Sequence, residues 1–194
     1  MGCDIHLYKE KQINGKWVSA DEWTPYDYGD DEKGIEVDWK KRFTDRNYEL
    51  FGLLCKGVRS EHALSLIARG LPFDASPEVL QTSERYGCDG HSHSYLYIHE
   101  LRSLIEALKA TTTRIEGMKD KGELEILDAS IASGNPDWSL LYPYCGWASN
   151  SEKYAEFSLD VPASFIVGNS IERIIAGFDG VDGDNHRIVF FFDN

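Results

Sequence analysis

The stretch YGCDGHSHSYLYIHEL, residues 86 to 101, holds side chains that could bind a metal ion or move a proton. His91 and His93 lie there with Cys88, Asp89 and His99, so the stretch holds three of the chain's six histidines. If the backbone is extended, the H-x-H spacing aims His91 and His93 in the same direction, as many metal sites require. An isolated H-x-H pair is a weak signal, and a polar loop in front of a helix is the plainer interpretation.

The opening residues offer a second candidate pair. Residues 3 to 9 alternate between apolar and polar side chains, which predicts a half-buried strand with Asp4 and His6 as neighbours on one face. If that strand met the segment of His91 and His93, three imidazoles and one carboxylate would suit a divalent transition metal. In the structural alternative, which the sequence alone favours somewhat, Asp4 bonds a turn and His6 lies under a loop.

A third set of polar residues lies in the stretch TDRNYELF. Asp45, Arg46 and Asn47 precede a predicted helix, whose first backbone N–H groups attract anions, and an arginine there could hold phosphate or carboxylate through two hydrogen bonds. A structural role is equally compatible with the sequence: Asp45 or Asn47 caps the helix and Arg46 pairs with a nearby acid. Arg59 is a weaker anion-binding candidate, and Asp193 lies so near the end of the sequence that it would normally be dismissed.

Strands from the two ends of the sequence are expected to position these residues. Asn14-Gly15 predicts a tight hairpin after residues 3 to 9, with the chain returning through Trp17 and Val18. The stretch HRIVFFFDN, residues 186 to 194, is largely apolar on both faces, which favours the middle of a sheet and pairing with the first strand. The pattern predicts an α+β fold with a mostly antiparallel sheet from the N- and C-terminal strands, and helices from the middle of the chain packed on it.

Apolar periodicity and capping residues predict the helices. The predicted helical segments are 45–57, 61–69, 77–86, 98–110, one or two helices within 111–133, and one more around 171–178. No internal repeat or long linker divides the sequence, so we expect a single domain over residues 1–194, with residues 21–38 as an acidic loop insert.

Composition narrows the classes of function. A net charge of −13 opposes general nucleic-acid binding, because nonspecific affinity depends on Lys and Arg. No apolar run has the length of a membrane span, and four widely spaced cysteines without a C-x-x-C pair fit a reducing cytoplasm. Walker, G-x-G-x-x-G, G-x-S-x-G and H-E-x-x-H motifs are all missing from the sequence.

Five blocks along the chain resemble those of a family of uncharacterised bacteriophage proteins. They are MGCDIHLYKE with NGKW, DRNYELFGLL with KGVR, GLP, GHSHSYL with EL, and RIVFFFDN, and together they span nearly the whole chain. This sequence departs from the family pattern in its long acidic insert and in Tyr97, where a threonine helix cap is usual. The resemblance implies a composite polar pocket, because the family's motifs fall on polar positions: Asp4, His6, Asp45, Arg46, Asn47, Arg59, His91, His93 and Asp193.

Three functions follow as hypotheses. The first is a phage accessory protein of the host cytoplasm that binds a small anionic, nucleotide-derived metabolite, such as an immune signal of the host, through Arg46, Arg59 and the histidines. An aromatic side chain from residues 138–147 would stack on the base.

The second hypothesis is a metal-assisted or histidine-dependent hydrolase or transferase acting on a phosphorylated metabolite. His91 or His93 would be the base, Asp4 a catalytic partner and Arg46 the oxyanion partner. The third is a protein-binding inhibitor that uses the acidic surface of residues 21–38. All three hypotheses leave open whether the chain forms a homo-oligomer.

Overall fold

The computed structural model describes residues 2–27, 29, 33–141, 152–178, 180 and 183–193. These residues form the predicted α+β fold, with an antiparallel sheet from the two ends of the chain and helices from its middle. The chain divides into two compact units, which are Met1–Ala107 with Val167–Asn194, and Leu108–Ile166. The prediction of a single domain over residues 1–194 stays a prediction. No described helix combines the length and the apolar character needed to cross a membrane.

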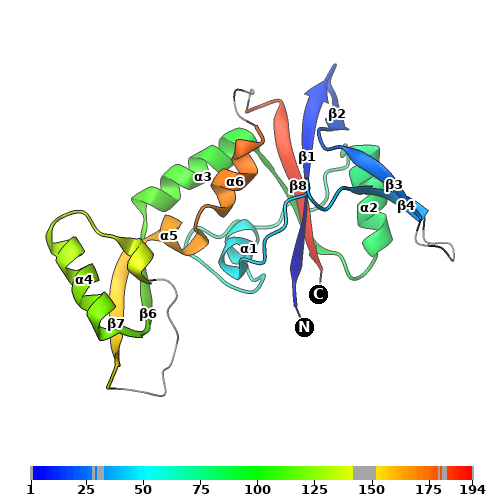
Figure 1. Ribbon diagram of the computed structural model, residues 1–194. Coiled ribbons are helices and arrows are strands. Elements are labelled where there is room, and N and C mark those ends of the chain that lie inside the picture. The colour runs from blue at the N-terminus through cyan, green and yellow to red at the C-terminus, as the bar shows by residue number, and fades with distance from the viewer. Residues whose placement is uncertain are drawn as a thin grey trace. The chain divides into compact units, whose positions relative to one another are not determined.

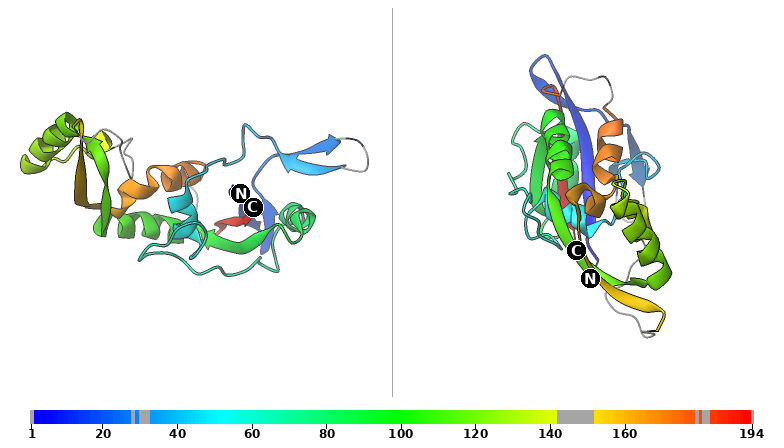
Figure 2. Two further views of the ribbon diagram at one scale, coloured as in Figure 1. Left: turned by 90° about the horizontal axis from the view of Figure 1, so that it is seen from below. Right: turned by 90° about the vertical axis from the view of Figure 1, so that its left-hand side faces the viewer.

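The first unit is built on a four-stranded antiparallel sheet in the order β2-β1-β8-β5. The strands are β1 (Asp4–Ile13), β2 (Lys16–Ser19), β5 (His91–Tyr97) and β8 (His186–Asp193). Asn14 and Gly15 join β1 to β2 with φ of 51° and 75°, as the predicted hairpin requires. The start of β1 and the end of β8 lie side by side (Figures 1 and 2), which confirms the predicted pairing of the two ends.

β8 is buried on both faces because helices cover each side of the sheet. On one face Phe192 contacts Phe51 of α1 (Tyr48–Leu54), with 5.1 Å between ring centroids. On the other face Val189 and Phe191 pack with Val79 of α2 (Pro77–Tyr86). Figure 1 shows α1 and α2 on either side of β1 and β8. The largely apolar pattern of the last strand therefore predicts its central position correctly.

Most of the other predicted helices of this unit are present. They are α2, α3 (Ile98–Ala110) and α6 (Ser170–Ala176). The helix predicted over residues 61–69 is wrong. Leu66 bonds residues outside the segment instead of forming helical bonds: its N–H donates to the Leu53 carbonyl, and its carbonyl accepts from Lys56 N–H.

The acidic segment 21–38 is a strand pair rather than the predicted loop. β3 (Trp23–Asp27) and β4 (Lys33–Val37) form a two-stranded sheet, which extends away from the four-stranded sheet in the left-hand view of Figure 2. Its base is anchored by Trp23, whose ring stacks on Tyr8 with a centroid separation of 5.2 Å, and by Asp21, which accepts a 2.6 Å hydrogen bond from Lys9 N–H.

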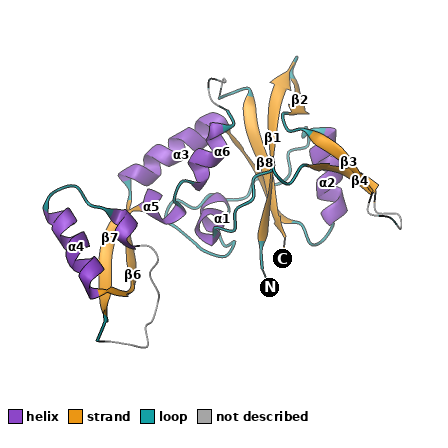
Figure 3. Ribbon diagram, in the orientation of Figure 1, coloured by secondary structure: helices purple, strands orange, loops and turns teal. Residues whose placement is uncertain are grey.

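The second unit is a strand pair covered by a helix (Figure 3). β6 (Thr112–Asp120) pairs with β7 (Tyr154–Pro162), and α4 (Lys121–Ala132) and the short η1 (Trp138–Leu141) pack on them; α5 (Ala163–Val167) follows β7. The helices predicted within 111–133 are wrong for the first half of that segment. Ile115 and Met118 are three residues apart, a spacing that also occurs along one face of a helix. They nevertheless belong to β6, which pairs with β7 some forty residues away.

A buried ion cluster joins the sheet of the first unit to the start of α2. Arg187 is 2% exposed and donates from Nε to Glu10 at 2.7 Å and from both Nη atoms to Asp74 at 3.0 Å. Glu10 is fully buried and also accepts from Ser76 N–H at 2.6 Å. The guanidinium lies 4.0 Å from the centroid of the Trp17 ring. Each charge is thus paired, as burial requires.

Candidate functional site

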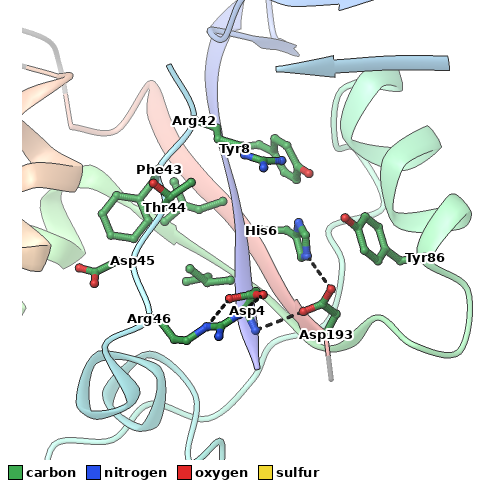
Figure 4. A pocket seen from close by; sticks show the side chains of 12 residues that line it. Asp4, His6, Tyr8, Arg42, Phe43, Thr44, Asp45, Arg46, Tyr86 and Asp193 are labelled. Atoms are coloured by element: carbon green, nitrogen blue, oxygen red, sulfur yellow. Dashed lines mark hydrogen bonds and ion pairs between the residues drawn. The ribbon is translucent and has the colours of Figure 1, made fainter. Parts of the chain in front are cut away.

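A pocket of about 490 Å³ opens beside the first half of β1 (Figure 4). Five of the polar residues singled out from the sequence line it: Asp4, His6, Asp45, Arg46 and Asp193. The sequence did not single out the other residues of the lining as site candidates; these are Ile5, Leu7, Tyr8, Arg42, Phe43, Thr44 and Tyr86. Residues of β1, α2, β8 and the segment 42–46, which are far apart in the sequence, therefore meet at one cavity.

The strand registers explain why these side chains meet. Alternation along β1 puts Asp4, His6 and Tyr8 on the face of the sheet that α2 covers. Antiparallel pairing sets Asp193 opposite Asp4 at the end of β8. Tyr86, the last residue of α2, brings its ring to 4.2 Å from the His6 ring, measured between centroids.

His6 and Asp193 form an imidazole–carboxylate pair inside the pocket (Figure 4). His6 Nε2 lies 3.2 Å from Asp193 Oδ2, yet the ring nitrogen is not aligned for a regular hydrogen bond. The imidazole is enclosed by Tyr86 and by Phe191, whose ring stacks at 4.9 Å. Burial lowers the pKa of His6, and Asp193 offsets part of that effect. His6 is therefore neutral near pH 7 and able to accept a proton.

Asp4 and Arg46 form a second pair at the rim. Arg46 donates from Nε and Nη2 to the two carboxylate oxygens of Asp4, at 2.8 and 2.7 Å. The bond to Arg46 lowers the pKa of Asp4, so this carboxylate stays ionised. The side chains of Arg46 and Asp4 are 59% and 51% exposed, which limits the stability the pair contributes.

Arg42 is the cation that sequence reasoning missed. It lines the pocket, and its charge acts on Asp4, His6 and Tyr8. Within the described ranges no hydrogen bond or ion pair holds its guanidinium. A signal was present in the sequence: Lys40, Lys41 and Arg42 form a basic run in an acidic chain.

The two tyrosines at the pocket remain protonated hydrogen-bond donors. Burial raises the pKa of Tyr8 and Tyr86 above the ordinary phenol value. Their rings supply the aromatic surface that we expected from residues 138–147. Trp138 instead packs against the core of the second unit, and residues 142–147 lie outside the described residues.

The predicted anion site at the start of α1 is not formed. The Asn47 side chain caps the helix by accepting from Glu49 N–H at 3.1 Å and Leu50 N–H at 3.2 Å. Asp45 accepts from the Ser170 hydroxyl at 2.6 Å and also pairs with Arg173. The structural alternative for this stretch is therefore the observed one, although Asp45 and Arg46 still line the pocket.

Arg59 lies apart from the pocket lining. Its Nη2 donates to the Gly2 carbonyl at 2.7 Å, and its guanidinium lies 5.5 Å from the centroid of the Tyr48 ring. Arg59 therefore ties the beginning of the chain to the region around α1 and does not serve as a pocket cation.

His91 and His93 lie on a strand, β5, and point to opposite faces of the sheet. The register shifts between His91 and Ser94, and Ser92 has a φ of 54°, so the usual alternation is broken. His93 stacks on Phe191 at 4.8 Å, whereas His91 lies 6.2 Å from Phe192, the next residue of β8. The expectation that both rings point the same way is wrong.

The proposed metal set of Asp4, His6, His91 and His93 is consequently not assembled. His93 bonds the Ser83 hydroxyl at 2.8 Å, and His91 Nδ1 lies 3.0 Å from the Ser92 hydroxyl. Across the part of the chain that the structure describes, no three His, Cys, Asp or Glu side chains are arranged to hold a metal ion. Neither His91 nor His93 lines the pocket, so His6 takes their place as the candidate base.

No protein-family model, curated protein or solved structure matches the chain. Any proposal about function therefore starts from the chemistry of the pocket.

Proposed function

We propose that this chain binds a small anionic, nucleotide-derived metabolite in the pocket beside β1. The observation that carries the proposal is Arg42, a cation that lines the pocket without an ion-pair partner among the described residues. Lys41, its neighbour, already pairs with Glu22, and Lys40 lies over the Trp39 ring. Arg42 is thus the member of the basic run that is left to bind a ligand.

Two of the three acidic residues of the lining are neutralised by arginines, whereas the third, Asp193, lies beside the neutral His6. Asp4 is paired with Arg46, and Asp45 with Arg173. The guanidinium of Arg42 can then meet a phosphate or carboxylate through two parallel hydrogen bonds.

The remaining lining suits the other parts of a nucleotide. Carboxylate oxygens of Asp4 and Asp193 can accept hydrogen bonds from sugar hydroxyls. The partly exposed ring of Tyr86 offers an aromatic surface to a base, and the protonated hydroxyls of Tyr8 and Tyr86 can donate to the ligand. A volume of about 490 Å³ lies within the range of small-molecule pockets.

The biological setting follows from the resemblance to bacteriophage proteins. We propose an accessory protein of the host cytoplasm that sequesters a nucleotide signal of host immunity. Sequestration requires tight, stoichiometric binding without turnover, which separates this function from catalysis.

Calorimetric titration of the full chain with guanosine and uridine 5′-monophosphates tests the proposal. We expect one ligand per chain, and an affinity lower by about tenfold or more in Arg42→Gln, because a charge-assisted contact is lost. Arg114→Gln is the matched control, since Arg114 is an exposed arginine of the second unit that pairs with Asp160. The proposal fails if neither nucleotide binds, or if Arg42→Gln and Arg114→Gln bind equally well.

The His6–Asp193 pair favours a second candidate, a histidine-dependent hydrolase or transferase acting on a phosphorylated metabolite. A neutral imidazole held 3.2 Å from a carboxylate can take a proton from water or a hydroxyl, as a general base does. This hypothesis predicts product formation that disappears in His6→Gln while the far-ultraviolet circular dichroism stays unchanged. Stoichiometric binding of intact ligand would contradict it.

The acidic-inhibitor hypothesis stays a prediction. Several acids of residues 21–38 have local partners: Asp21 contacts Lys9, and Asp27 pairs with Lys33. Nothing in the described part of the segment favours this function over the pocket.

A further inference from the structure

We propose that the free edge of β1 recognises the planar hydrogen-bonding edge of the ligand, through the backbone N–H and C=O groups of Ile5 and Leu7. This inference rests on the proposed function and specifies how the same pocket selects a nucleobase.

The pairing of β1 shows which way these backbone groups point. Gln12 N–H donates to the Asn185 carbonyl, on the side of β8, so the even-numbered residues of β1 bond β8. Lys9 faces the other side: its carbonyl accepts from Ala20 N–H, and its N–H donates to the Asp21 carboxylate.

Ile5 and Leu7 are odd-numbered, like Lys9, and the register between β1 and β8 is unbroken. Their N–H and C=O groups therefore point away from β8, towards the open edge. In the described portion of the chain these groups have no hydrogen-bond partner.

The same two residues belong to the pocket lining. Ile5 and Leu7 are only 6% and 5% exposed. Their side chains lie on the opposite face of the sheet from His6 and Tyr8, because successive strand residues alternate. The pocket thus combines an aromatic and charged lining with a row of polar backbone groups.

The short length of this edge favours a small planar group over a peptide strand. From Lys9 onwards the edge is covered by Asp21, Ala20 and then β2. The strand itself begins at Asp4. Ile5 and Leu7 are therefore its two residues on the open edge, and the edge they form is about three residues long, shorter than the five or six residues of a typical strand.

A nucleobase fits these groups chemically. The N–H and C=O of one extended residue face the same direction, so a partner with an adjacent donor and acceptor can bond both at once, as paired residues do in an antiparallel ladder. Bases carry such donor and acceptor pairs on their Watson–Crick edges, for example N1–H with O6 in guanine. Such a partner would also satisfy backbone groups that are costly to leave unpaired.

Amide hydrogen exchange of the ¹⁵N-labelled full chain tests the edge without any ligand. We expect the Ile5 and Leu7 amides to exchange at least about tenfold faster than those of His6 and Tyr8, which bond β8. Saturating guanosine 5′-monophosphate should then slow exchange at Ile5 or Leu7. Slow exchange at both residues in the free protein overturns the inference.

Methylated ligands test the recognition itself. We expect 1-methylguanosine 5′-monophosphate, which lacks the N1–H donor, to bind about tenfold or more weakly than guanosine 5′-monophosphate. Equal affinities, with no protection of Ile5 or Leu7, overturn the inference; the proposed function still stands if the binding depends on Arg42. Absence of binding by guanosine and uridine monophosphates removes the proposed function, and this inference with it.

Discussion

Replacing Arg187 tests whether the buried ion cluster holds the first unit together. Arg187→Met keeps much of the side-chain volume but removes the partner of Glu10, whose side chain is 0% exposed. Among the residues that the structure describes, Glu10 then retains only the hydrogen bond from Ser76 N–H. Breaking a buried pair by removing one member costs about 3–5 kcal/mol, because the remaining charge stays desolvated. Loss of the contact between the guanidinium and the Trp17 ring acts in the same direction.

Equilibrium urea unfolding, followed by tryptophan fluorescence, measures this cost. Arg114→Met is the control, because its ion pair with Asp160 is exposed and should change the free energy of unfolding by no more than about 1 kcal/mol. The double variant Glu10→Gln/Arg187→Met should recover part of the loss, since no unpaired charge remains buried. If Arg187→Met is as stable as Arg114→Met, or the double variant recovers nothing, the reasoning about a desolvated Glu10 is refuted.

Three further predictions concern packing, capping and pH. Gly52→Ala should lower the free energy of unfolding by about 1–3 kcal/mol or more, because a Cβ there would overlap the backbone of Ser60; an unchanged urea midpoint would contradict this. Asn47→Ala should cost about 1 kcal/mol or more, because it removes the cap of α1 and the bonds that Asn47 Nδ2 donates to the Val167 carbonyl and the Ser170 hydroxyl, whereas Asn47→Asp should restore only the cap. Burial lowers the pKa of His6 and His93, so the stability they contribute is present above the ordinary value of 6.5 and is lost as pH falls through their lower folded values. Histidine NMR titration checks those pKa values, and a folded pKa above 6.5 for both would refute the sign.

Local signals were sufficient for part of the fold. Asn14-Gly15 determines a hairpin through its positive φ angles, and the largely apolar faces of β8 favour the middle of a sheet. The strand β6 could not be recognised in this way, because its stability depends on a distant partner, β7. The helix predicted over residues 61–69 was wrong because the segment also depends on distant partners. Its backbone bonds go to α1 and to the segment that follows α1.

The candidate site was predictable only where it depended on strand alternation. Alternation placed Asp4 and His6 on one face, and the family resemblance added Asp193. The break at Ser92 is invisible in the sequence, since non-glycine residues seldom adopt positive φ. Arg42 belongs to no motif, and its importance follows from which other cations are already paired.

The central place of β8 has a consequence for biosynthesis. The order β2-β1-β8-β5 leaves β1 and β5 without direct contact, so neither has its main partner until residues 186–193 have been translated. Over that interval the nascent chain presents unsatisfied strand edges, which are prone to aggregate. Ribosome stalling or slow codons upstream of His186 should therefore make the yield of native protein depend on chaperones.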